Sequence, residues 1–264
     1  MLLTQRHISI FKPLTFLWLA YALVGCQKEN TTAQDNTASA VASTVAASEH
    51  IPTVHAETLA VTLPQKIACE SDECTEYDVK TIQTNVNWLN DYFLDRLKKD
   101  IPMAFTKASR PTPPHLKEED TSKNSYSVRF LSQNNQLATF VLETDLYTAG
   151  SAHGMYHREY IVFDLAQKKR IHLADLFPTE RQVDVYSALF HANKKWLEEH
   201  GIQHGHLEPT DNFYYDDKGV VFVYPLYELA SYAEGMTELV LPYDQVKTLF
   251  YPQYVPQGPV KKVE

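Results

Sequence analysis

The chain has 264 residues, of which 44% are hydrophobic, and it carries 24 basic against 33 acidic residues, a formal net charge of −9. These values are typical of a folded protein and exclude a disordered or collagen-like chain. A nucleic-acid-binding protein needs a basic surface that displaces counterions from phosphate, so the acidic excess argues against nucleic acid as a partner.

The N-terminus has the layout of a secretory signal peptide over residues 1–25, in which a basic start precedes an apolar run over 14–24. This run is shorter than the roughly 20 apolar residues that a membrane-spanning helix needs. Leu-Val-Gly-Cys at 23–26 resembles a bacterial lipobox, which implies that Cys26 is lipidated once the peptide is cleaved. Glutamine follows the cysteine, which implies anchoring at the periplasmic face of the outer membrane in a Gram-negative host. A plain secretory signal that ends beside a cysteine is the alternative.

The segment 26–60 is rich in alanine, serine and threonine and has no large aromatic residue. This composition predicts a flexible tether that lets the domain stand off the membrane. We expect the folded domain over 61–252 and a C-terminal tail over 253–264.

Two cysteines remain beside the lipidation site, Cys69 and Cys74, and they lie five positions apart. In the oxidising compartment that an exported protein reaches, such a pair is expected to form a disulfide. The alternative is half of a metal site, but the second cysteine pair that such a site needs is missing from the sequence.

Apolar residues recur at three- and four-residue steps between Val79 and Lys99, which predicts an amphipathic helix. The segments 125–131 and 137–147 are rich in β-branched and aromatic residues and are joined by a polar stretch, so they predict a β-hairpin. A third strand is expected over 158–165.

A second long helix is predicted to begin with Thr179 as its N-cap and to end before Gly201. Its buried stripe is expected to consist of Val183, Tyr186, Phe190 and Leu197. Strands are expected at 213–215, 220–224 and 237–241, followed by a short helix over 243–250. Hairpins and helices segregated in this way indicate an α+β fold, in which two long helices pack on an antiparallel sheet.

The loop after the second strand, from Tyr147 to His157, has the most unusual local sequence. Gly150 and Gly154 flank its first histidine and permit backbone angles that other residues resist. The functional interpretation is a binding loop, and the alternative is a long hairpin loop in which His153 is hydrogen-bonded structurally. The HExxH motif of zinc proteases is excluded, because Gly154 stands in place of the base.

Three more histidines, His200, His204 and His206, follow the second predicted helix. Their imidazoles have the donor chemistry for zinc, but the glycines among them indicate a solvated surface loop, so no metal or other cofactor is predicted. The sequence contains no G-x-S-x-G elbow, P-loop or dinucleotide fingerprint. Nucleophilic catalysis and nucleotide chemistry therefore have no support from motifs.

Two longer patterns resemble the RsiV-like extracytoplasmic domain. The first runs Y-T-A-G-S-A-H-G at 147–154, Y-I-V-F-D-L at 160–165 and I-H-L-A-D-L-F at 171–177, and is similar to that family's Y-x-G-G-A-H-G … F-D-L … L-x-D-L-F. The second runs V-F-V-Y-P-L-Y-E-L-A-S-Y-A-E-G at 221–235 and V-L-P at 240–242, and is similar to F-x-F-x-P-Y-E-I-A-x-Y-A-x-G … I-P. The chain departs from the family by Ser151 in place of the second glycine and by the inserted Leu226.

The resemblance covers about 75 to 250 and implies a two-part α+β domain displayed outside the membrane. In one branch of the family this domain recognises lysozyme and controls a membrane-bound anti-sigma factor, and in another it precedes a peptidoglycan deacetylase domain. We expect neither accessory in this chain, so only an envelope recognition module carries over.

Three functional hypotheses follow. The first is a lipid-anchored module that binds a lysozyme-like muramidase or a peptidoglycan component, and the acidic charge would steer a cationic lysozyme toward it. Its binding residues would be Tyr147, Gly150, Ser151, His153, Gly154, Tyr156, Tyr227 and Tyr232. The second is an envelope hydrolase in which Asp145 orients His153 as the general base. The third is a structural envelope lipoprotein with protein partners only. Binding rather than catalysis is the favoured interpretation.

Overall fold

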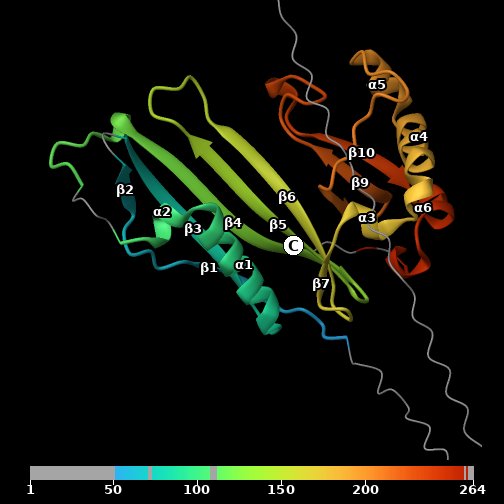
Figure 1. The fold of residues 1–264 in the computed structure, drawn as a ribbon, viewed down its shortest axis with the longest axis horizontal. Coiled ribbons are helices and arrows are strands. Elements are labelled where there is room, and N and C mark those ends of the chain that lie inside the picture. The colour runs from blue at the N-terminus through green and yellow to red at the C-terminus, as the bar shows by residue number, and fades with distance from the viewer. Residues whose placement is uncertain (1–50, 71–72, 108–111, 259, 261–264) are drawn as a thin grey trace, which may run out of the picture. The chain divides into compact units, whose positions relative to one another are not determined.

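A computed structural model describes residues 51–70, 73–107, 112–258 and 260, so the predictions for the signal peptide and for Cys26 lie outside the described residues. Within the described residues a seven-stranded sheet has the order β1-β3-β4-β5-β6-β7, with β2 beside β3 (Figure 1). Its strands are β1 Ala56–Ala60, β2 Ile67–Glu70, β3 Glu73–Thr84, β4 Thr121–Asn134, β5 Leu137–Tyr147, β6 Met155–Asp164 and β7 Lys169–Ile171. Neighbouring strands are antiparallel except β3 and β4, which are parallel.

Helix α1 (Asn87–Asp100) connects the two parallel strands and lies across one face of this sheet (Figure 1). The short helix α2 (Pro102–Phe105) follows it. Phe93 of α1 packs on Phe140 of β5 at a ring separation of 5.1 Å, and Phe163 of β6 lies 5.7 Å from Phe140. All three rings are fully buried, so α1 covers the face of the sheet that carries Phe140.

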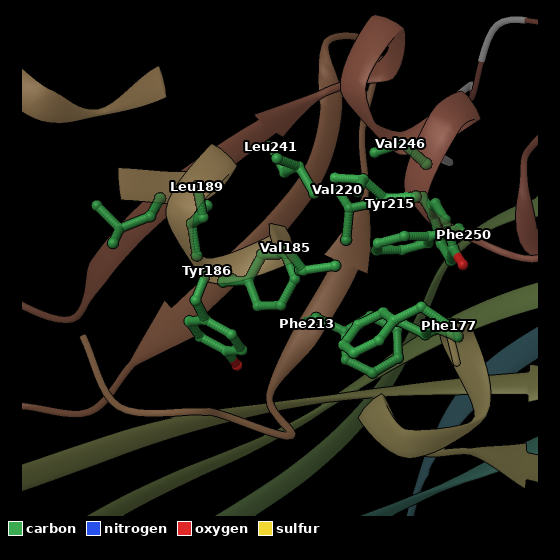
Figure 2. Packing of buried hydrophobic residues seen from close by; sticks show 14 of the residues in the cluster. Phe177, Val185, Tyr186, Leu189, Phe213, Tyr215, Val220, Leu241, Val246 and Phe250 are labelled. Atoms are coloured by element: carbon green, nitrogen blue, oxygen red, sulfur yellow. The ribbon is translucent and has the colours of Figure 1, made fainter. Parts of the chain in front are cut away.

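A second, smaller sheet has the order β10-β9-β8, with β8 Phe213–Tyr215, β9 Gly219–Tyr224 and β10 Thr237–Pro242. Helices α3 (Leu173–Leu176), α4 (Gln182–Ala192), α5 (Lys194–Glu199) and α6 (Tyr243–Leu249) accompany this sheet. Side chains from α4, α6 and all three strands fill a common core (Figure 2). Val185 and Leu189 of α4 are fully buried there, against Val220 and Leu241.

The architecture confirms the α+β fold class with antiparallel sheets and accompanying helices. The hairpin of β4 and β5 and the strand β6 lie where the alternation predicted them. Cys69 and Cys74 form the expected disulfide, which joins opposite positions of β2 and β3. No helix in the described part of the chain is long and apolar enough to cross a membrane.

The predicted helix from Val79 was wrong in its first third. Residues up to Thr84 continue strand β3, and the helix begins at Asn87. The side-chain oxygen of Asn90 accepts a hydrogen bond from the Thr84 backbone nitrogen at 2.7 Å, which ties the strand end to the first helical turn. The segment contains β-branched residues that pair with strands on both sides, and this pairing prevails over the helical spacing of Val79 and Ile82.

The prediction of a second long helix was wrong in two respects: the helix is not continuous, and one residue of the predicted buried stripe is exposed. It begins with a 3₁₀ turn at Thr179–Arg181 in which the Thr179 side chain is not a cap, and it breaks at Asn193 between α4 and α5. The Asn193 amide nitrogen donates hydrogen bonds to the carbonyl oxygens of Leu189 and Val240, at 2.8 and 3.0 Å. Val183 is 79% exposed, and Val185 takes the buried position.

The folded part extends beyond 61–252 on both sides. Strand β1 pairs with β3 within the segment that composition assigned to the tether, and Val54 lies in the core. At the other end Tyr254 is buried and its carbonyl accepts a hydrogen bond from the Tyr215 hydroxyl at 2.9 Å. The tether prediction for 51–60 and the tail prediction for 253–258 were therefore wrong, because both segments pack on the sheets.

Candidate binding groove

The strand register aligns one row of polar side chains across the large sheet. Asp78 of β3, Ser125 of β4, Asp145 of β5 and Tyr156 of β6 stand directly opposite one another in neighbouring strands. Side chains alternate between the two faces of a strand, and α1 covers the face that carries Phe140. Residues at odd positions of β5 therefore project from the face that α1 leaves open.

A cavity of about 520 Å³ lies at one end of this open face. Its polar lining comes from Glu76, Asp78, Lys123, Asn124, Ser125 and Asp145. Its apolar and aromatic lining comes from Leu146, Tyr147, Met155, Tyr156 and Tyr232. Leu146 and Met155 are exposed and stand opposite each other at the end of the β5–β6 hairpin. A concave site with apolar walls and a few polar groups is the usual form of a ligand site.

Tyr232, from the 3₁₀ turn Tyr232–Glu234, closes the cavity from the side of the small sheet. Its hydroxyl donates a hydrogen bond to the carbonyl oxygen of Gly154 at 2.9 Å. Its ring contacts two others, with His153 at 4.3 Å and Tyr227 at 5.7 Å between ring centres. Tyr227 holds its backbone at a φ of 67°, which L residues adopt at a cost, so the turn that presents this ring is strained.

A ladder of ion pairs continues along the open face from the first cavity. Arg158 lies 3.2 Å from Asp145 and 3.3 Å from Glu143, measured between nitrogen and oxygen atoms. Arg129 forms two hydrogen bonds to the Glu143 carboxylate, at 2.8 and 2.9 Å. The Arg129 hydrogen bond holds the pKa of Glu143 below its ordinary value against the opposing effect of burial. Glu143 is therefore ionised at neutral pH, where it pairs with Arg129.

A second cavity of about 310 Å³ has three residues of the ladder in its lining. Arg129, Thr139, Val141, Glu143, Arg158 and Tyr160 of the large sheet line it, together with Tyr214 and Tyr215 of β8. The rings of Tyr160 and Tyr214 stack at 4.3 Å between centres. Burial raises the pKa of Tyr160 to about 12, so its phenol stays protonated in the physiological range. The two cavities share no lining residue, and we use the name open-face groove for the pair of them.

The asparagine Asn212 fixes the small sheet against this groove. Its side-chain oxygen accepts a hydrogen bond from the Tyr160 backbone nitrogen at 2.7 Å, and its nitrogen donates one to the Arg158 carbonyl at 2.9 Å. The amide thereby occupies the place of a neighbouring strand on the free edge of β6. Tyr214 is held beside Tyr160 as a consequence.

The structure brings together four of the eight predicted binding residues in the first cavity, namely Tyr147, Gly154, Tyr156 and Tyr232. His153 and Tyr227 lie behind them against the Tyr232 ring. Gly150 and Ser151 form an exposed turn at the loop tip, closed by a hydrogen bond from the Ser151 nitrogen to the Thr148 carbonyl at 3.0 Å. Gly150 has a φ of 79°, so the turn explains this glycine without a ligand.

His153 and Asp145 are not brought together. Asp145 pairs with Arg158, whereas Nδ1 of His153 donates to the carbonyl of Gly154 at 2.9 Å. The arrangement of a carboxylate that orients a histidine base, which the hydrolase hypothesis needs, is therefore not formed between them.

Two of the three later histidines also contact separate partners. Nε2 of His200 lies 2.6 Å from a Glu234 oxygen, and Nε2 of His204 lies 3.0 Å from the Ser187 hydroxyl. His206 is exposed. In the described ranges no group of three histidine, cysteine, aspartate or glutamate side chains is placed to hold a metal ion.

Five residues of the cavities and their surroundings were not predicted from the sequence, namely Glu76, Asp78, Lys123, Arg158 and Asn212. The first two alternate on the outer face of β3, and reading 73–84 with a two-residue period would have placed them on a common face. No local signal identifies Asn212, because its role depends on a strand 52 positions away.

Comparison with known proteins agrees with the fold. Residues 174–244, from α3 to the start of α6, match the family described as "Protein of unknown function (DUF3298)". The crystal structure of a DUF3298 family protein from Pseudomonas aeruginosa PAO1 is similar at a TM-score of 0.57 and 20% identity, over 79% of this chain and 99% of that one. A DUF3298 family member from Bacteroides fragilis NCTC 9343 is similar at a TM-score of 0.57 and 15% identity, over 76% and 95% of the two chains. The curated proteins give no match.

These comparisons define the class of the protein: an α+β protein that contains a DUF3298 match and shares the fold of two structures from that family. At 15 and 20% identity the likeness establishes the fold and assigns no ligand.

Proposed function

We propose that the protein is a lipid-anchored recognition module of the cell envelope, which binds peptidoglycan or a muramidase that acts on it. The observation that carries this proposal is the first cavity of the open-face groove, where Tyr147, Tyr156 and Tyr232 meet Asp78 and Asp145. Tyrosine supplies apolar contact area together with a polar hydroxyl and is enriched in recognition surfaces for that reason.

The electrostatics of the cavity support binding of an envelope partner with basic character. Three carboxylates, Glu76, Asp78 and Asp145, stand against the single ammonium group of Lys123 among the charged residues that line the cavity. Lys123 is itself paired with Glu118. The net charge of the whole chain is −9, which steers a cationic lysozyme toward the protein at low ionic strength.

The RsiV-like resemblance and the lipobox support the envelope location. Both rest on sequence patterns, at 147–177 and 221–242 for the domain and at 23–26 for the anchor. Replacement of Cys26, whose thiol the lipobox marks for acylation, tests the lipid anchor directly. The full chain is expected in the membrane fraction and the Cys26→Ser variant in the soluble fraction of the same cells. Recovery of the variant with membranes in equal amount would contradict lipid anchoring.

Titration calorimetry tests the recognition itself. The exported Cys26→Ser chain is titrated with lysozyme and, separately, with soluble muropeptides, each at low and high salt. Saturable binding of at least one ligand is expected, with affinity reduced tenfold or more by Tyr156→Ala in the cavity. Val183→Ser is the matched control, because this exposed side chain lies on α4 outside the groove. Absence of binding to both ligands by a folded chain would overturn the proposal.

A further inference from the structure

The second cavity is lined by residues of both sheets. On the large sheet, Arg129, Val141 and Tyr160 stand opposite one another in β4, β5 and β6. On the small sheet, Tyr214 and Tyr215 of β8 line it. Its volume of about 310 Å³ lies at the lower end of the range of roughly 300 to 1,000 Å³ that is usual for ligand pockets. The cavity therefore has the size for one small molecule.

Two deeply buried hydroxyl groups line this cavity. Ser132 and Thr139 stand opposite each other in the β4–β5 pairing and are 3% and 2% exposed. Neither hydroxyl forms a hydrogen bond with another described residue, yet the sealed side-chain atoms without a hydrogen bond in the described ranges are Thr81 Oγ1 and Arg170 Nε only. The Ser132 and Thr139 oxygens are therefore open to the cavity. Buried polar groups are almost always hydrogen-bonded, so these two need a partner that the protein does not supply.

The Tyr160 hydroxyl is a third group of this kind. The Tyr160 ring stacks on Tyr214, whose own hydroxyl donates a hydrogen bond to Glu238 at 3.2 Å. The Tyr160 hydroxyl forms no hydrogen bond with the part of the chain that the structure describes. A hydroxyl both donates and accepts, so the three groups together can bond the hydroxyl and amide substituents of a ligand.

The charged groups at the cavity are engaged with one another. Both oxygens of Glu143 accept hydrogen bonds from Arg129. Arg158 contacts the carboxylates of Glu143 and Asp145. Two guanidinium groups therefore stand against two carboxylates. A charged ligand would enter this enclosed space without a counter-charge unless it broke one of these pairs, and both alternatives cost free energy. The balance of charge favours an uncharged ligand.

We propose that the second cavity binds one small uncharged molecule with several hydroxyl or amide groups, of the size of a single sugar ring. Its polar groups bond the hydroxyls of Ser132, Thr139 and Tyr160, and its apolar side lies against Val141. The first cavity shares no lining residue with this site. The proposal therefore goes beyond the recognition function, which rests on the first cavity.

Sugars that differ in charge test the class of ligand. The exported Cys26→Ser chain is titrated with two uncharged sugars, glucose and N-acetylglucosamine, and with cationic glucosamine and anionic glucuronic acid. Saturable binding of at least one uncharged sugar is expected, with affinity for both charged sugars at least tenfold lower. Equal or tighter binding of a charged sugar would overturn the proposed class. A folded chain that binds neither uncharged sugar has a cavity for water only, and this would overturn the proposal.

Two threonine variants distinguish a ligand site from a packing role. Thr139→Val removes a hydroxyl that has no protein partner and keeps the shape of the side chain. It is expected to leave the Tm unchanged or raised and to lower the sugar affinity at least fivefold. Thr84→Val, outside both cavities, is the matched control, because the Thr84 hydroxyl donates to the Asn90 side-chain oxygen at 2.8 Å and accepts from the Val86 nitrogen at 3.0 Å. This variant is expected to lower the Tm and to keep the sugar affinity within twofold. Unchanged affinity in Thr139→Val would overturn the proposal.

A variant of the first cavity keeps this proposal and the proposed function distinguishable. Tyr147→Ala is expected to leave the sugar affinity within twofold. Loss of sugar binding in Tyr147→Ala and not in Thr139→Val would place the sugar in the first cavity and overturn the proposal. Lysozyme binding without sugar binding would overturn it and leave the proposed function standing. Sugar binding that Thr139→Val weakens, in a chain that binds neither lysozyme nor muropeptides, would do the reverse.

Discussion

The hydroxyl of Tyr232 donates a hydrogen bond to the carbonyl oxygen of Gly154 across 78 positions of sequence, at 2.9 Å. The bond joins the 3₁₀ turn beside the small sheet to the β5–β6 loop of the large one. It closes the side of the first cavity, and the stack of His153 and Tyr227 on the same ring holds the tyrosine in place. The Tyr232–Glu234 turn and the β5–β6 loop therefore hold each other in the positions that form the cavity.

Removal of the Tyr232 hydroxyl distinguishes the stability that comes from the hydrogen bond from the stability that comes from the ring contacts. Tyr232→Phe is expected to lower the free energy of unfolding by about 1 kcal/mol, because the Gly154 carbonyl loses one of its two hydrogen bonds while the bond from His153 and the Tyr232 ring remain. Tyr227→Phe is the matched control, since its side chain is exposed and its expected change lies below 0.5 kcal/mol, roughly the limit for surface substitutions. Urea unfolding of both variants gives the comparison. Equal loss in the two would contradict a stabilising role for the bond.

The disulfide is expected to contribute to stability without determining the fold. Cys69 and Cys74 are separated by 5 positions, so the closed loop is short and the chain-entropy model gives about 2 kcal/mol of stabilisation. The two residues also stand opposite each other in the β2–β3 pairing, and we expect this pairing to persist when the bond is reduced. Reductant should lower the Tm of the native chain and leave that of the Cys69→Ser/Cys74→Ser variant unchanged. Loss of far-UV circular dichroism on reduction would show that the pairing depends on the bond.

Local patterns predicted the elements whose packing partners are near in sequence. The β4–β5 hairpin and β9 follow from alternation and polar turns, and Tyr147 and Tyr156 were placed at the site because they flank one loop. The strand at Val79–Thr84 was missed because its pairing partners lie outside the segment, with β4 opposite Val79 and Lys80 and β1 opposite Lys80 to Thr84. Glu76 and Asp78 of the first cavity were missed for the same reason, since the parallel pairing of β3 with β4 brings Asp78 opposite Ser125.

The pair of His200 and Glu234 should make stability depend on pH within a defined range. The hydrogen bond to Glu234 raises the pKa of His200, and the same bond lowers the pKa of Glu234. The histidine contribution is complete below its ordinary pKa of 6.5 and is lost as the pH rises through the raised value. The glutamate contribution is present above 4.5 and is lost as the pH falls through the lowered value.

Both groups are therefore charged and paired between pH 4.5 and 6.5. The Tm difference between the wild type and His200→Gln is expected to be largest in this range and to shrink on the alkaline side. Glu199 acts on His200 in the same direction, and the stacked Trp196 ring is retained in the variant. His206→Gln, at an exposed loop position, is the control and should show a difference that is flat with pH. A constant difference for His200→Gln would show that the histidine acts through packing alone.

Two asparagines make the same kind of contact in different places, and this allows stability to be separated from ligand binding. Asn212 bridges the backbone of Arg158 and Tyr160 on β6, beside the groove. Asn193 bridges the nitrogen and oxygen of Val240 on β10, away from it. Substitution of either by alanine leaves backbone groups without their partner, so each variant is expected to lose about 1–3 kcal/mol of unfolding free energy.

Only Asn212→Ala should also lower the affinity for the ligand. Without its amide the small sheet is no longer fixed to β6, and Tyr214 can move away from Tyr160 in the second cavity. Affinity for the soluble muropeptides of the proposed function is therefore expected to fall at least fivefold in Asn212→Ala and to stay within twofold in Asn193→Ala, at a temperature where both variants are folded. If both variants bind as the wild type does, the position of the small sheet is irrelevant to the groove. If both lose affinity equally, the effect is one of general stability, and the Asn212 contact has no special part in forming the second cavity.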